Sequence, residues 1–391
     1  MVLKSTSIDV AGDYILSITT IVQALIMLLQ LILGDSGLMD KDFVSLIRVA
    51  ISGLFTLFSF YWICKRRPLL FVGLYLLAFI LFSISLLLSP DNKDAIFSEG
   101  IRFTLCICIP IFLSMASISN IQIFHRVCLV ISLCCFVIGA VYGFLFVSGK
   151  LILDDFYNMS YGYALLFPTM YFVYRGSSFY LLLGFILFLF MLLCGSRGPL
   201  VPVLLFFIWK SAIRGGTKAK MIFFCVIVIL ILLFPLMLNI LDDIGFDSRT
   251  LYLFLNGEIG NDSNRSELHS VIMQKIELSP FWGYGVFGDR IFLDGGYCHN
   301  IFIELFVDFG VFLPILIILL FLFYYWCNLK HLSNLDFDWI FLLGLMSCIP
   351  LLVSSSYLID FRFFLFLGTL SYYVKHKKKL IASKTITTKN I

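Results

Sequence analysis

The sequence predicts an all-α integral membrane protein with about twelve transmembrane helices and one large extracytoplasmic loop. Of its 391 residues, 61% are hydrophobic and 13% are charged, which is about half the charged fraction of a soluble domain. Apolar runs of the length that a bilayer requires, about 17–25 residues, recur along most of the chain. The exception is 241–298, which holds nine acids and four bases. We therefore expect function to reside at this loop.

The apolar runs are expected to form one polytopic domain over residues 1–391. The runs at 179–195 and 198–212 lie close enough to form a broken hairpin. The expected spans are 14–33, 45–64, 69–88, 102–118, 127–147, 160–174, 179–195, 198–212, 221–240, 300–326, 339–358 and 361–374.

The distribution of charge predicts the orientation. With the N-terminus in the cytoplasm, 17 of the 28 basic residues fall on inner segments, whereas 20 of the 24 acids fall on outer segments or at outer helix ends. Basic residues concentrate in cytoplasmic loops. Both chain ends are therefore expected inside, and 241–298 is expected outside.

The cysteines indicate no disulfide framework and no metal site. Ten of the eleven lie in or beside apolar segments, where they act as small hydrophobes. Only Cys298 lies on the loop, and we expect it to be exposed and without a partner. No spacing typical of zinc ligands occurs, so we expect no metal.

The segment Gly195-Ser196-Arg197-Gly198-Pro199 places a charge between two apolar runs. An arginine at hydrocarbon depth costs up to about 2.5–3.5 kcal/mol. The glycines and Pro199 allow the helices to break and expose backbone N–H groups, so the turn can bind an anion together with Arg197. The alternative is a short re-entrant hairpin whose arginine extends toward the headgroups.

A short amphipathic helix is expected in the loop after Asp262-Ser263-Asn264, which offer N-caps. Its apolar positions recur with helical period at Leu268, Val271, Ile272 and Ile276. Arg265 then lies in the first turn, where the helix dipole disfavours a cation. An anion bound between Arg265 and the free N–H groups would remove this conflict. The alternative is a surface arginine paired with Glu267 or Asp262.

His299 precedes the apolar run at 300–326, on which Asn300, Glu304 and Asp308 recur every four residues. This spacing places the three polar side chains on one helix face. Carboxylates at membrane depth usually face a cavity or a partner, and histidine titrates near neutral pH. We expect His299 to be catalytic, with Asn300 and Glu304 supporting it. The alternative is that His299 only hydrogen-bonds the loop to the span.

Three further loop features have two interpretations each. Arg249 lies near Asp247, and Arg290 is adjacent to Asp289. A local salt bridge is the simplest interpretation of each arginine, and contact with substrate is the alternative. The aromatic turn at 282–285 can stack on a sugar ring or anchor the loop at the membrane interface.

Taken in order, these motifs resemble the O-antigen polymerase and O-antigen ligase superfamily. The ordered set is Gly195-Ser196-Arg197-Gly198, Arg265, Ser279-Pro280-Phe281-Trp282-Gly283-Tyr284-Gly285 and His299-Asn300-x3-Glu304-x5-Gly310. The resemblance covers about 180–325 by motif and the rest of the chain by hydropathy. Many members have a second glycine three residues after Gly310, where this chain has Leu313, and this difference bears on local helix packing.

The resemblance implies a metal-independent, cofactor-free glycosyltransferase of the multi-span, GT-C-like type in the bacterial inner membrane, with its active site facing the periplasm. The donor and acceptor would be undecaprenyl-diphosphate-linked oligosaccharides. Arg197 and Arg265 would hold the donor diphosphate, and His299 would lie at the reaction centre, where a general base is needed. Other expected partners are membrane lipid, a chain-length regulator and a flippase, and no nucleic acid is expected.

Within this superfamily we expect a polymerase of O-antigen or a related surface polysaccharide. The compact acidic loop favours this assignment, as do the segments at 248–251 and 288–290 and the carboxylates of Glu304 and Asp308. The alternative is a ligase that transfers the glycan to lipid A core. A transporter or flippase would show repeated halves and polar residues at mid-membrane depth in several spans. A passive scaffold would not need His299 and the arginines together.

Overall fold

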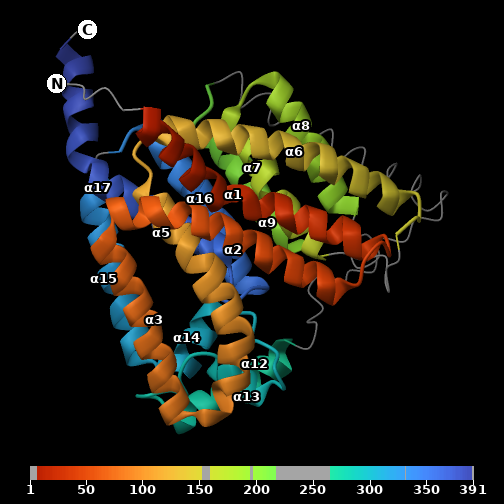
Figure 1. Cartoon of the computed structure of the whole chain (residues 1–391), viewed down its shortest axis with the longest axis vertical. Helices are drawn as coiled ribbons and strands as arrows, with labels where there is room; N and C mark the ends of the chain where they lie inside the picture. Colours follow the sequence, from red (N-terminus) through yellow and green to blue (C-terminus); the bar gives the residue numbers. More distant parts are fainter. Residues whose placement is uncertain (1–6, 152–158, 194–196, 217–264, 331, 390–391) are drawn as a thin grey trace. The chain divides into compact units, whose positions relative to one another are not determined.

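The structure is a computed structural model that describes residues 7–151, 159–193, 197–216, 265–330 and 332–389 (Figure 1). In these residues the regular structure is helical throughout and contains no strand. The elements are α1 (Ser7–Asp35), α2 (Lys41–Arg66), α3 (Pro68–Leu88), η1 (Pro90–Asn92), α4 (Lys93–Ala95), η2 (Ile96–Cys108), α5 (Ile109–Ser117), α6 (Ile121–Val147), α7 (Met159–Arg175), α8 (Ser178–Leu193), α9 (Arg197–Ile208), η3 (Trp209–Ile213), α12 (Arg265–Leu278), α13 (Gly288–Phe292), α14 (Ile301–Phe309), α15 (Phe312–Leu329), α16 (Asn334–Val353) and α17 (Phe361–Lys389).

Seven helices of the described chain are long and apolar enough to cross a membrane. Two of them, α3 and α15, leave most of their large apolar side chains exposed, as a surface facing lipid requires. The expected all-α integral membrane class is therefore confirmed, whereas the number twelve stays a prediction. The seven are Ile8–Asp35, Phe43–Arg66, Pro68–Leu88, Pro90–Ser117, Ile121–Phe146, Phe312–Leu329 and Asn334–Val353.

The expected single span at 300–326 is wrong. The chain forms the short helix α14, breaks at Gly310 and continues as α15. Gly310 has a φ of +74°, a conformation that L side chains rarely adopt, and the next residue, Val311, donates its N–H to the carbonyl of Pro280 at 2.8 Å. The polar stripe is consequently confined to α14 and its cap, and only α15 is a candidate span.

The chain divides into two compact units. The first comprises Met1–Ile21, Val49–Val127 and Asp262–Ile391, and the second comprises Val22–Arg48 and Cys128–Asn261. Helices α3 and α5, η2 and the helices from α12 to α17 belong to the first unit. Helices α7, α8 and α9 belong to the second.

In the second unit, α7 packs against α8 and α9, and polar groups inside it are paired. The rings of Tyr142 and Tyr161 stack with centroids 4.4 Å apart. The Tyr142 hydroxyl donates to the Asp35 carboxylate at 2.6 Å, and the Tyr161 hydroxyl donates to the carbonyl of Gly139 at 2.6 Å. These bonds satisfy buried polar atoms that would otherwise oppose folding.

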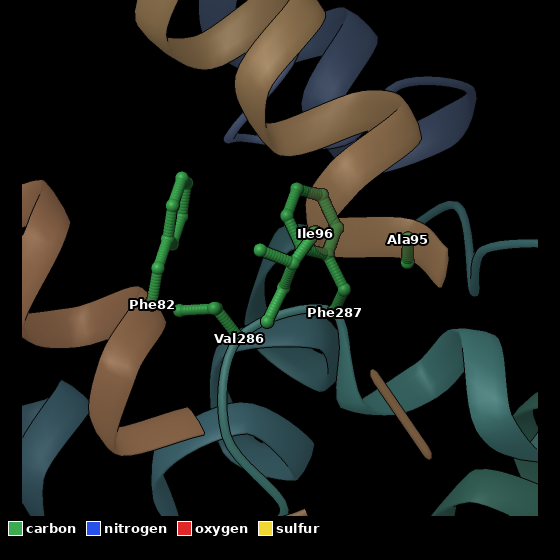
Figure 2. Packing of buried hydrophobic residues seen from close by; sticks show 5 residues of the cluster. All are labelled: Phe82, Ala95, Ile96, Val286 and Phe287. Carbon is green, nitrogen blue, oxygen red and sulfur yellow. The ribbon is translucent and has the colours of Figure 1, made fainter. Parts of the chain in front are cut away.

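In the first unit, α17 packs along α5 and α16, and α12, α13 and α14 gather near one end of α3 (Figure 1). A hydrophobic cluster joins that end of α3 to the chain after α12 (Figure 2). Its buried members are Phe82, Ala95, Ile96, Val286 and Phe287. Full burial of side chains as large as Phe287 stabilises a fold by about 1.5–3 kcal/mol each. The cluster therefore fixes the segment that leads into α13.

The turn at 279–285 closes the end of α14. The N–H groups of Tyr284 and Gly285 donate to the carbonyls of Val307 and Asp308 at 2.8 and 2.9 Å, which lie in the last turn of α14 and have no partner within the helix. A Cβ on Gly283 would stand 2.5 Å from the carbonyl of Asp308. Glycine is therefore required where the two backbones meet.

We expect Gly283→Ala to lower the thermal unfolding temperature of the purified protein in detergent. Its φ of +65° costs an L residue about 1–2 kcal/mol, and overpacking against a backbone adds about 1–3 kcal/mol. Gly295→Ala is the matched control, because Gly295 has a φ of +85° but open space around its Cβ position. Equal losses in the two variants would contradict the close approach.

Candidate functional site

The centre of the first unit is a buried ion-pair network around Arg290 of α13. Its guanidinium lies 2.6 Å from Asp289, 2.9 Å from Glu304 and 3.2 Å from Glu99. Arg290, Asp289 and Glu304 are each less than 5% exposed, whereas the Glu99 side chain is 25% exposed. The predicted salt bridge between neighbours in sequence is therefore present, and two further carboxylates join it from α14 and η2.

Hydrogen bonds extend this network to the segment between α16 and α17. Glu304 accepts from the Ser356 hydroxyl and from the N–H of Tyr357. Asp308 accepts from the Tyr357 hydroxyl at 2.7 Å and from the N–H of Gly288 at 2.9 Å. The two carboxylates of α14 are thus paired inside the protein, as buried charges must be.

The network carries more negative than positive charge. Burial raises the pKa of Glu304 to about 7, with a further contribution from the Asp289 carboxylate, and Arg290 opposes the shift. Burial also raises the pKa of Asp308, and the charges of Asp289 and Glu304 add to the effect. Burial alone would lower the pKa of Arg290, but the adjacent carboxylates raise it. Arg290 therefore stays charged, and the α14 carboxylates hold protons more tightly than exposed ones.

Cys298 is buried, and the expectation that it is exposed is wrong. Its N–H donates to Asp289 at 2.9 Å, and its carbonyl accepts from Nε2 of His269 at 2.8 Å. Its side chain packs with Ile272 and Ile276 of α12. Both backbone groups of this residue are therefore held, one by the network and one by α12.

His299 follows Cys298 in a left-handed conformation with a φ of +56°. Such backbone is uncommon for residues other than glycine, and it persists only where surrounding contacts impose it. The imidazole is half-buried, and its centroid lies 4.2 Å from that of the Tyr297 ring. Asn300 then caps α14, because its side-chain oxygen accepts from the N–H groups of Phe302 and Ile303 at 3.0 and 3.3 Å.

The structure brings Arg265 into the electrostatic environment of His299. Burial lowers the pKa of His299 below 6.5, and the positive charge of Arg265 is the next largest cause. His269 and Arg290 lower it further, whereas a hydrogen bond to the Ser354 backbone raises it. The lowered pKa favours the neutral imidazole, which is the form that can accept a proton.

The expected site residues fall into two groups. His299, Asn300, Glu304, Arg290 and Arg265 all lie in the first unit. Arg197 is the first residue of α9 in the second unit.

Arg249 lies outside the described residues.

Four residues that the sequence analysis did not select also contribute: Glu99, Tyr297, Ser356 and Tyr357. Glu99 could have been selected from the sequence, because it is an acid beside an apolar run, as Glu304 is. Ser356 and Tyr357 fall inside the expected span 339–358, but α16 ends at Val353 and both residues lie in the segment before α17.

The aromatic turn lies against the start of α15. Trp282 is 83% exposed, and the ring of Phe281 stacks on Phe312, the first residue of α15, at 5.1 Å. The Tyr284 hydroxyl instead donates to the carbonyl of Lys275. Because Phe312 begins a lipid-facing span, this arrangement favours an interface anchor over a platform for sugars.

Fold and site together define a multi-pass membrane protein with a buried ion-pair network beside a half-buried histidine. A family model described as O-antigen ligase matches residues 182–318, and this segment contains Arg197, Arg265, Arg290 and His299. This match supports the predicted resemblance to the O-antigen polymerase/ligase superfamily, whose members are glycosyltransferase-like enzymes. No curated protein and no solved structure matches it.

We expect Arg290→Met to abolish accumulation of folded protein, because removing one partner of a buried ion pair costs about 3–5 kcal/mol. Glu304→Gln should be milder, since Arg290 keeps Asp289 and Glu99. Arg290→Lys is the matched control that retains charge without the planar fork. Size-exclusion profiles in detergent report the folded fraction, and a normal profile for Arg290→Met would contradict a structural network.

Fluorescence quenching can test the position of Trp282. In a variant that retains Trp282 as its only tryptophan, brominated lipids should quench emission strongly and aqueous iodide weakly. A variant retaining only Trp339, which is fully buried, should respond to neither quencher. Strong quenching of Trp282 by iodide alone would instead place the turn in water.

Proposed function

We propose that the protein is a polymerase of O-antigen or a related surface polysaccharide. It would join undecaprenyl-diphosphate-linked repeat units at the periplasmic face of the bacterial inner membrane. The observation that carries the proposal is the half-buried His299 in a left-handed backbone, whose pKa is lowered by burial and by the charge of Arg265, within the segment that matches the family model. The first residue supplies a base and the second a site for an anion.

In the proposed reaction, a hydroxyl of the acceptor glycan attacks the anomeric carbon of the donor. His299 takes the hydroxyl proton as the new C–O bond forms. The bond from that carbon to the diphosphate breaks, and its electron pair leaves with the lipid diphosphate. Arg265 stabilises the developing negative charge, because a guanidinium can contact phosphate oxygens through two hydrogen bonds. The diphosphate linkage supplies the driving force.

Charge distinguishes Arg265 from Arg290 as the donor-binding arginine. The guanidinium of Arg290 is buried and contacts Asp289, Glu304 and Glu99. An anion placed there would be repelled by the surrounding carboxylates. We therefore assign the diphosphate to Arg265 and propose a structural role for Arg290. Arg197 is retained as a second diphosphate ligand on its sequence context alone.

A ligase is the second candidate, because the matching family model carries that description. The two activities share the donor and differ in the acceptor, which is lipid A core for a ligase. Deletion of the gene followed by gel analysis of surface polysaccharide separates them. A single repeat unit on lipid A core supports the polymerase, whereas a bare core contradicts it.

Complementation of the deletion strain tests the arginines. Arg197→Ala and Arg265→Ala should each abolish long-chain product at normal protein level, and lysine at either position should restore only part, since it lacks the bidentate fork. Full activity of both alanine variants would remove the diphosphate assignment.

His299→Ala should lower turnover of purified protein on lipid-linked repeat units by about 10²–10⁴. Because the base acts only when neutral, activity should fall as pH drops through the lowered pKa of His299, below about 6.5. The charged and titratable groups that lower this pKa are Arg265, His269 and Arg290.

Arg265→Gln should shift the loss of activity at low pH, the acid limb of the pH profile, to higher pH, because loss of the positive charge raises the pKa of His299. Arg265→Lys keeps the charge and should leave the limb in place. Near wild-type turnover by His299→Gln, with an unchanged pH profile, would end the base hypothesis.

A further inference from the structure

We infer that Tyr297 is the positioning residue of His299, acting together with the backbone carbonyl of Ser354, and that Nδ1 is the nitrogen that accepts the proton. This inference rests on the proposed function and adds to it the residues that orient the base. Ser354 lies outside the family-matched segment 182–318.

Tyr297 is contacted at its ring by two side chains and is held at its hydroxyl. The ring lies beside the imidazole of His299, with centroids 4.2 Å apart and planes inclined by 55°. The guanidinium of Arg290 stands 5.2 Å from the centroid of the same ring. The hydroxyl donates to the carbonyl of Ser354 at 3.1 Å. Tyr297 therefore connects the buried network, the imidazole and the segment after α16.

The backbone of His299 is fixed from the residue before it and the residue after it. Cys298 is tied to Asp289 and to His269 through its N–H and its carbonyl. Asn300 caps α14. Together these bonds impose the left-handed backbone of His299, and this backbone presents the imidazole to Tyr297 and Ser354.

The hydrogen bonds of the imidazole distinguish its two nitrogens. The Ser354 backbone is its hydrogen-bond partner, and Nδ1 is buried without a hydrogen-bond partner among the described residues. A neutral imidazole has one N–H and one lone pair. Because a carbonyl only accepts and Nδ1 has no partner, we assign the N–H that faces Ser354 to Nε2 and the lone pair to Nδ1.

This arrangement balances the proton in the proposed reaction. The proton of the acceptor hydroxyl moves to Nδ1 while the glycosidic bond forms and the diphosphate leaves. The resulting imidazolium keeps its Nε2–H bond to the Ser354 carbonyl, which strengthens as the ring becomes positive. The proton then returns to solvent. Since Nδ1 is covered in the ligand-free protein, binding of the acceptor must expose it.

Two substitutions of Tyr297 separate positioning from folding. Tyr297→Phe keeps the ring that contacts His299 and Arg290 but removes the hydroxyl bond, and it should lower kcat about tenfold with KM unchanged. Tyr297→Leu also removes the ring and should lower kcat further. Tyr75→Phe is the matched control, because it also removes a tyrosine hydroxyl bond of 3.1 Å to a backbone carbonyl, that of Leu105, and should retain wild-type kcat. All values are measured per folded protein, and Tyr297→Phe decides the question if Tyr297→Leu fails to fold.

The tautomer gives a second readout that a purely structural role would not alter. In protein labelled with ¹⁵N-histidine, with His299 assigned by comparison with His299→Gln, the neutral ring should carry its proton on Nε2. Tyr297→Phe should increase the share of the other tautomer. Wild-type kcat in both Tyr297 variants, or a proton on Nδ1 in the wild type, would overturn the inference.

The two proposals fail in different ways. Full activity of His299→Ala removes the proposed function and the inference with it. Loss of activity in His299→Ala, combined with wild-type kcat in both Tyr297 variants, removes only the inference.

Discussion

The fold of the first unit depends on one buried guanidinium. Removing an ion from water costs several kcal/mol even after relaxation, so Arg290 can be buried only with anions in contact. Glu99, Asp289 and Glu304 meet this requirement from η2, α13 and α14. Glu304 in turn accepts a hydrogen bond from the Ser356 hydroxyl. Segments separated by about two hundred residues in sequence are thereby held at a single point.

The same network positions His299, the proposed base, through the residues that precede it. Asp289 holds the N–H of Cys298, and Arg290 stacks on Tyr297, so both residues before His299 are anchored to it. An orientation imposed in this way is preorganised and requires no rearrangement during the reaction. The surplus of carboxylates also excludes anions from the network. In the proposed reaction, a lipid diphosphate would therefore bind at Arg265, which lies on the separate helix α12.

Composition and hydropathy were sufficient for the fold class, because the need to satisfy every backbone group in lipid leaves helices as the natural outcome for long apolar runs. Local patterns also placed Arg265 at the start of a helix, where the structure has α12. The pairing of Glu99 with Arg290 could not be predicted from the sequence, because no periodic pattern relates residues that are 191 positions apart. The break at Gly310 and the burial of Cys298 likewise depend on partners distant in sequence, Pro280 and His269.

The motif residues of this chain divide by physical role. Gly283 allows a backbone turn to close the end of α14, and Asn300 closes its beginning. A helix of only nine residues is thereby fixed at both ends, which is necessary because so short a helix is marginal by itself. The rigid α14 holds Glu304 against Arg290, and its N-cap Asn300 fixes the backbone next to His299. These residues therefore act through geometry, and our proposal assigns the chemistry to His299 and Arg265.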